Sequence, residues 1–101
     1  MHVVEYSGEL VSEMIDKGDV TAICQAVTSD RAAYPLLAGV DEYDDTTFNA
    51  RQAAVLADEL RRLATERPDL VDATARLITL AELLAPAPRR PHHRRLIFNG
   101  D

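Results

Sequence analysis

The sequence predicts an α+β fold, in which an antiparallel pair of long helices covers a small sheet formed by the N-terminal and C-terminal segments. Three observations favour it. Two stretches in the second half of the chain repeat apolar residues with helical spacing, and short strand-like patterns lie at both ends. A length of 101 residues suits a single domain spanning residues 1–101. Because only 5% of the residues are aromatic, we expect a core of leucine, valine, isoleucine and alanine.

The first quarter of the chain predicts strands, with one alternative left open. Residues 1–6 show the loose alternation of a short strand. The turn-forming run at 16–19 then favours a hairpin between strands 9–15 and 20–26. The apolar spacing favours two helices instead, the second of them capped by Asp19. Turn chemistry and β-branched content tip the balance slightly towards the hairpin.

Residues 28–45 are rich in aspartate, proline and glycine, which is typical of a connecting segment. A connection of this length rarely lies free of a small domain. We therefore expect its apolar group to be held against the core, and this group consists of Tyr34, Leu36, Leu37 and Val40.

Two helices dominate the second half of the prediction. The first runs from about residue 46 to residue 66, with Asp45, Thr46 or Thr47 as its cap. Its apolar residues share one face, and the charged residues lie mostly on the other: Arg51, Asp58, Glu59, Arg61 and Arg62. The second helix covers residues 69–84 and begins beside a proline. The short connection between them predicts an antiparallel helical hairpin.

The last thirteen residues oppose the charge of the rest. Residues 89–101 hold four arginines and one aspartate, +4 − 1 = +3, so the first 88 residues carry −6 − 3 = −9. Within this tail, residues 94–98 predict a strand that directs Leu96 and Phe98 inward. We expect this strand to close the domain, with three arginines directed outward to the protein's own carboxylates or to a partner: Arg89, Arg90 and Arg94.

Four carboxylates lie within five residues, at Asp41, Glu42, Asp44 and Asp45. Hard cations prefer carboxylate oxygens, but this run lacks the alternating Asp/Asn series, the glycine and the final glutamate of an EF-hand loop. We therefore predict no metal site. We interpret Asp44 and Asp45 as capping and polarising the following helix, and all four residues as an acidic patch for a basic partner or for the protein's own arginines.

The histidines and the single cysteine give no stronger sign of chemistry. His92 and His93 are adjacent, so in an extended strand they point to opposite faces and cannot share one zinc ion. Cys24 together with His93 and Asn99 has the residue types of a thiol hydrolase, but Cys24 falls on an apolar pattern typical of a core position. The sequence predicts no catalytic residue and no cofactor.

The overall charge narrows the class of partner. A net charge of −6 opposes binding to nucleic acid or to an anionic membrane, and the arginine-rich tail lacks the interleaved aromatic residues of single-strand binding. The chain also lacks a secretory signal and a membrane-spanning run, and its lone cysteine suits a reducing compartment. We therefore expect a cytoplasmic protein.

Three segments resemble a known group of proteins. They are Tyr34-Pro35-Leu36-Leu37-Ala38-Gly39-Val40-Asp41, then Tyr43-Asp44-Asp45-Thr46-Thr47-Phe48-Asn49 with Gln52 and Glu59-Leu60, and finally His93-Arg94-Arg95-Leu96-Ile97-Phe98-Asn99-Gly100-Asp101. They are similar to a family of small, acidic, uncharacterised proteins from high-GC Gram-positive bacteria, across roughly residues 30–101. The resemblance implies a bacterial cytoplasmic origin, an Asp-Thr-x-Phe-Asn helix start and no activity.

These observations favour a noncatalytic protein-interaction module that binds a basic partner through the acidic surface around residues 41–45. An immunity-like, antitoxin-like or regulatory role is a specific form of this prediction. Two alternatives stay open. One is a homodimer that pairs tail strands between protomers. The other is an enzyme-like domain that binds a small ligand or a divalent ion at the acidic segment.

Overall fold

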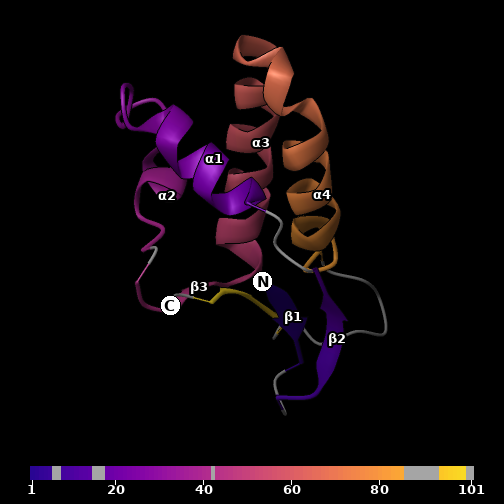
Figure 1. The fold of residues 1–101 in the computed structure, drawn as a ribbon. Helices are drawn as coiled ribbons and strands as arrows, with labels where there is room; N and C mark the ends of the chain where they lie inside the picture. Colours follow the sequence, from indigo (N-terminus) through magenta and orange to yellow (C-terminus); the bar gives the residue numbers. More distant parts are fainter. Residues whose placement is uncertain (6–7, 15–17, 42, 86–93, 100–101) are drawn as a thin grey trace.

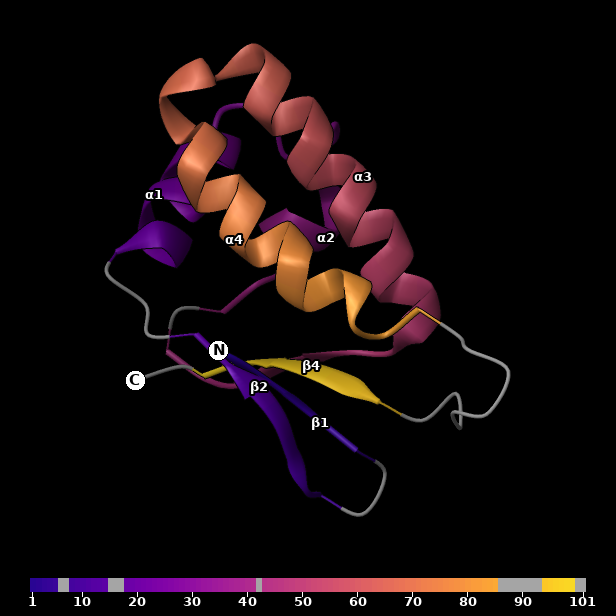
Figure 2. The same ribbon diagram turned by 90° about the vertical axis from the view of Figure 1, so that its right-hand side faces the viewer.

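The computed structural model describes residues 1–5, 8–14, 18–41, 43–85 and 94–99. Helices pack over one face of an antiparallel sheet (Figure 1, Figure 2), so the predicted α+β class is confirmed. Along the chain the elements are β1 (His2–Val4), β2 (Leu10–Glu13), α1 (Asp19–Val27), α2 (Pro35–Ala38), β3 (Thr46–Phe48), α3 (Ala50–Glu66), the 3-10 turn η1 (Pro68–Leu70), α4 (Val71–Glu82) and β4 (Arg95–Phe98).

The C-terminal strand lies inside the sheet. The strand order is β2-β1-β4-β3, and within it Leu96 of β4 stands opposite both Val3 of β1 and Phe48 of β3. Leu96 is fully buried and Phe98 nearly so, which confirms the predicted inward alternation. Since both edges of β4 are paired within the chain, this strand has no free edge for the tail-to-tail homodimer considered from the sequence.

The N-terminal quarter combines parts of both alternatives. β2 pairs with β1, so the hairpin joins the first two strands and not residues 9–15 with 20–26 as predicted. Residues 19–27 form a helix because Ile23 and Val27, one helical turn apart, bury their side chains in the core. Of the turn expected at 16–19, the structure describes Gly18 and Asp19, and Gly18 lies in the left-handed region at a φ of 94°. The helical alternative is therefore correct for α1 and wrong for β2. Its cap is also wrong, because Gly18 is the N-cap of α1 and Asp19 is the first residue of the helix.

The helical hairpin is confirmed, but its first helix begins later than predicted. Residues 46–48 form an edge strand, and the ring of Phe48 packs edge-on against Phe98 with 5.7 Å between centroids. None of the three predicted caps is the cap of α3, because Thr46 and Thr47 lie within this strand and Asp45 precedes it. Asn49 fills the role: its Oδ1 accepts from the Gln52 amide and the Gln52 Oε1 accepts from the Asn49 amide, each at 2.9 Å.

This capping box gives a first prediction. Replacing Asn49 with alanine removes the acceptor for an amide of the first turn, so we expect a loss of about 1 kcal/mol in the free energy of unfolding. Urea denaturation followed by circular dichroism measures it. Asn49→Asp keeps an acceptor oxygen and should retain most of the stability. An alanine variant as stable as the original protein would show that Asn49 is not the cap.

Candidate functional site

The start of the predicted acidic segment lines an open hollow of about 560 Å³. The second half of α1 and the end of α2 form its walls, and Asp41 and Tyr43 line it where the chain leaves α2 for β3. The Tyr43 side chain is 80% exposed, an unusual position for an aromatic residue in a chain that has so few. The hollow therefore combines a carboxylate and an accessible ring.

Local hydrogen bonds shape the acidic segment. The Tyr43 amide donates to Asp41 Oδ1 at 2.8 Å, and the Asp45 amide donates to Asp44 Oδ1 at 2.8 Å. The Asp41 amide donates to the hydroxyl of Thr46 at 3.0 Å and joins the segment to β3. Such side-chain turns suit aspartate. Among the described residues, the carboxylates of Asp41 and Asp44 accept only these backbone hydrogen bonds.

The structure corrects the interpretation of Asp44 and Asp45 as helix caps. Both are exposed and precede β3, so a three-residue strand and Asn49 separate them from α3. Glu42 lies outside the described residues. The structure thus places Asp41, Asp44 and Asp45 on the surface, and Asp41 is the one of them that lines the hollow.

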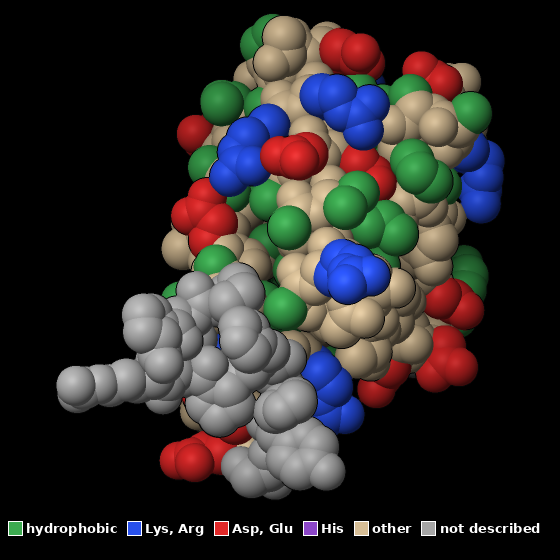
Figure 3. Space-filling view, turned by 180° about the vertical axis from the view of Figure 1, so that it is seen from behind, with side chains coloured by type: hydrophobic (Ala, Val, Ile, Leu, Met, Phe, Trp, Pro, Cys, Tyr) green, Lys and Arg blue, Asp and Glu red, His purple; other side chains and the backbone are tan. Residues whose placement is uncertain are grey.

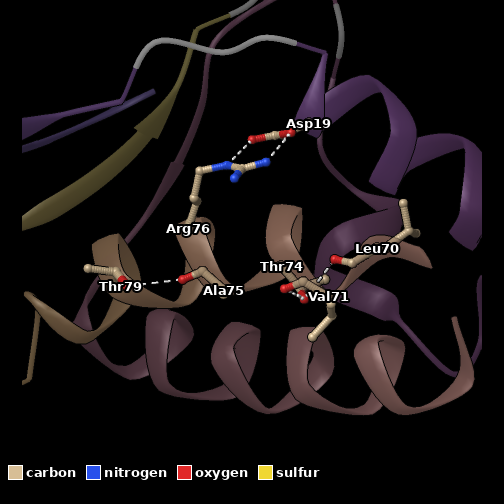
Figure 4. A network of polar contacts seen from close by, with 7 residues as sticks. All are labelled: Asp19, Leu70, Val71, Thr74, Ala75, Arg76 and Thr79. Carbon is tan, nitrogen blue, oxygen red and sulfur yellow. Dashed lines mark hydrogen bonds and ion pairs between the residues drawn. The ribbon is translucent and has the colours of Figure 1, made fainter. Parts of the chain in front are cut away.

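An ion pair holds α1, the first wall of the hollow, against the helical hairpin. The guanidinium of Arg76 on α4 donates to both carboxylate oxygens of Asp19 at the start of α1, at 2.7 and 3.0 Å (Figure 4). The same view shows the hydroxyl of the buried Thr74, which donates to the carbonyls of Leu70 and Val71 one turn earlier in the chain. This buried hydroxyl therefore has its hydrogen-bond acceptors close by in the chain. Because two hydrogen bonds join the guanidinium to the carboxylate, they fix the relative orientation of Asp19 and Arg76 as well as the distance between them.

A buried carboxylate holds α2, the second wall. Glu59 of α3 is fully buried, and its Oε1 accepts from the amides of Leu36 and Leu37, each at 3.1 Å. These amides belong to the first turn of α2, where backbone donors have no partner within the helix. The sequence-based placement of Glu59 among mostly exposed charges is therefore wrong. Burial of this acid depends on a short helix from a distant part of the chain.

Tyr34 adds a second attachment between the same elements. Its hydroxyl donates to Glu66 Oε2 at 2.6 Å, and the guanidinium of Arg62 lies 5.3 Å from the centre of its ring. Burial, and next the hydrogen bond to Glu66, raise the pKa of Tyr34 to about 12. Tyr34 and Leu37 are both nearly fully buried, which confirms that the long connection is held against the core.

The one described arginine among the three predicted outward-facing arginines points inward. Arg94 donates from Nε to Glu5 Oε1 at 3.0 Å and from Nη1 to the Leu83 carbonyl at 2.9 Å, and its side chain is only 15% exposed. The expectation that a tail arginine pairs with the protein's own acid is confirmed for Arg94, and its outward placement is wrong. Arg89 and Arg90 lie outside the described residues.

The described residues among those considered for metal binding or catalysis are not brought together. Cys24 is half-buried and lines the hollow, whereas the Asn99 side chain lies 2.9 Å from His2 Nδ1, where β1 and β4 pair. His92 and His93 fall outside the described residues. In the part of the chain that the structure describes, no three His, Cys, Asp or Glu side chains are grouped as metal ligands would be.

A second hollow, of about 290 Å³, lies between α3 and α4 and is lined largely by alanines. Its charged groups pair with one another, because Arg61 contacts Asp58 at 3.0 Å and Glu82 at 2.8 Å. Seen from the side away from α1 and α2, side chains of both charges are interspersed with hydrophobic ones (Figure 3).

Comparisons with protein-family models, with curated proteins and with solved structures found no match. No helix within the described parts of the chain is both long and apolar enough to cross a membrane. The resemblance to the small acidic family from high-GC Gram-positive bacteria stays a prediction, so any function must be argued from the hollow and its surroundings.

Proposed function

We propose that this protein is a noncatalytic interaction module that binds a basic protein partner at the hollow between α1 and α2. One observation carries the proposal: Asp41 and the accessible ring of Tyr43 line the same hollow, and the exposed acids Asp44 and Asp45 directly follow Tyr43 in the chain. Residues 32–50 hold four carboxylates and no lysine, arginine or histidine, so this part of the chain carries −4. Immunity-like, antitoxin-like or regulatory binding in the cytoplasm is the form of action that we propose.

The charges and the ring support different aspects of binding. Exposed carboxylates steer a basic partner towards the surface and make the association rate sensitive to salt. Aromatic residues at interfaces often contribute a large share of the binding energy, because a ring buries a large area at a small entropic cost. Tyr43 is the residue near the acids that can supply this contribution.

The size of the hollow favours a second candidate function, which is binding of a small ligand. About 560 Å³ lies within the usual range of small-molecule sites, and Arg31 and Asp41 offer opposite charges on its lining. A divalent ion is less well supported, because ion binding needs several converging carboxylates and the described residues provide no such group.

A basic probe tests the primary proposal. We expect a fluorescein-labelled nona-arginine peptide to bind at low salt, and the triple variant Asp41→Asn/Asp44→Asn/Asp45→Asn to weaken binding by about tenfold or more because the acidic surface is neutralised. Fluorescence anisotropy measures the dissociation constant. The matched control removes three exposed acids from the helical hairpin instead, as Asp58→Asn/Asp69→Asn/Asp72→Asn.

The two variants change the net charge equally, so their comparison separates a local site from general attraction. A selective loss in the first variant supports the acidic surface as the binding site. An equal loss in both variants would show that only net charge matters. If nona-arginine does not bind the unaltered protein at low salt, the proposal is abandoned.

A further inference from the structure

We propose that the hollow receives the side chain of an arginine from the basic partner, with its guanidinium between the Asp41 carboxylate and the Tyr43 ring. This inference rests on the proposed function and adds to it a particular anchor residue on the partner. It follows from the state of the Asp41 carboxylate, from the exposure of Tyr43, and from a cluster of the same three groups elsewhere in the molecule.

The Asp41 carboxylate is held in place and is still able to bind. Its Oδ1 accepts from the Tyr43 amide at 2.8 Å, which fixes the carboxylate relative to the backbone that carries the ring. Its Oδ2 accepts no hydrogen bond from any described residue. A planar guanidinium is the side chain best suited to such a carboxylate, since it donates two parallel hydrogen bonds in a fixed geometry.

The Tyr43 ring supplies the second half of the recognition. It is 80% exposed, and no described arginine or lysine lies over it. A guanidinium stacks on an aromatic face through cation–π attraction and stays weakly hydrated while doing so. An arginine is therefore favoured over a lysine, whose compact ammonium is more strongly hydrated.

The protein already combines these three groups where the start of α2 meets α3. Arg62 lies over the ring of Tyr34, and the hydroxyl of that tyrosine donates a hydrogen bond to the carboxylate of Glu66. Arginine, tyrosine and carboxylate thus form one cluster, in which Tyr34 is buried and the two charged residues are exposed. The hollow presents tyrosine and carboxylate without the arginine, so the missing third group is the one that the partner would supply.

Arg31 determines where the incoming cation lies. It also lines the hollow, and its Nη2 donates to the Ala38 carbonyl at 3.1 Å. Because like charges repel, the incoming guanidinium is excluded from the side of the hollow that Arg31 occupies. It lies at the rim beside Asp41 and Tyr43, with its methylene groups towards the half-buried Val40.

The test uses the blocked tripeptide acetyl-Gly-Arg-Gly-amide and the same peptide with citrulline, which keeps the shape of arginine without its charge. In nitrogen–proton correlation spectra of the whole protein, we expect the arginine peptide to cause saturable shifts at the amides of Ala38, Gly39, Asp41 and Tyr43. The citrulline peptide and the variants Asp41→Asn and Tyr43→Leu should each bind about tenfold more weakly, which corresponds to about 1.4 kcal/mol. Both substituted side chains are exposed, and the spectra verify that each variant is folded.

Equal binding of the citrulline peptide, or full binding by a folded Asp41→Asn variant, would overturn the inference. If nona-arginine binds with the selective loss described above but the tripeptide causes no saturable shift at the hollow, the arginine anchor is wrong and the acidic interface stands. If nona-arginine also fails to bind, both proposals fall.

Discussion

A chain that ends at Pro88 is expected to lose cooperative folding. The deletion removes β4, the strand that pairs with both β1 and β3, so it separates the two halves of the sheet. It also removes the buried side chains of Leu96 and Phe98, and a single large-to-small change in a core costs about 2–5 kcal/mol. Since small domains are stable by only about 5–15 kcal/mol, the combined loss exceeds what the remaining contacts can offset. Urea denaturation followed by circular dichroism should show no sigmoidal transition.

Two point variants of β4 identify the cause. Leu96→Ala should cost about 2–5 kcal/mol because Leu96 is fully buried between the sheet and the helices. Ile97→Ala changes the neighbouring residue, which points to the opposite face and is only half-buried, and it should cost clearly less. A truncated protein that unfolds cooperatively near the original urea midpoint would show that the tail is a free arm and not part of the core.

The parts of the fold that the sequence predicted correctly are those with a long or strict pattern. The apolar repeat of α3 continues over 17 residues, so errors at its ends did not affect its identification. In β4, four residues were enough to identify the strand, because the buried Leu96 and Phe98 alternate with the less buried Arg95 and Ile97. Side chains return to the same face every two residues in a strand and every 3.6 residues in a helix. These periods show which side chains face the core, even when the element that they pack against is not known.

The boundaries failed where several local signals competed. Residues 45–49 offer aspartate, threonine and asparagine as helix caps, and propensity alone does not choose among them. The signal that could have decided was the pair Asn49 and Gln52, spaced as a capping box. β3 has only three residues and exists because β4 lies beside it, so no local pattern predicts it. In the N-terminal quarter, the turn-forming residues around Gly18 did not show whether a strand or a helix followed them.

The candidate site could be predicted only in part, because it is built by contacts between distant segments. The acidic segment is visible in the sequence, but the hollow beside it requires α1 and α2 to meet across residues 28–34. Glu59 is the clearest case. The helical pattern of α3 places this acid among charged residues, and only the docking of α2 shows that it is buried. The amides in the first turn of a short helix need a hydrogen-bond acceptor, but the sequence does not show which residue supplies it.

Glu59→Ala is expected to destabilise the protein by about 3 kcal/mol or more. The substitution leaves the amides of Leu36 and Leu37 without their acceptor, and each unsatisfied buried donor costs about 1–3 kcal/mol. It also leaves a cavity where a fully buried side chain stood, which adds to the loss. Burying a carboxylate is itself unfavourable, but its removal recovers little here, because the backbone donors that it compensates remain in place.

Two further variants separate the carboxylate from the volume that it fills. Glu59→Gln keeps the shape and can keep one acceptor oxygen at the position of Oε1, where both amides donate to it. Its NH2 group then stands at the position of Oε2 and faces the Leu36 amide, so its loss should be intermediate. Glu66→Gln, two turns further along α3, affects only the exposed end of one hydrogen bond to Tyr34 and should cost less than about 1.5 kcal/mol. Urea midpoints rank the three variants, and amide exchange at Leu36 and Leu37 should accelerate in both Glu59 variants. If Glu59→Ala unfolds at the original midpoint, α2 is held by its apolar contacts alone, and the wall of the hollow does not depend on this carboxylate.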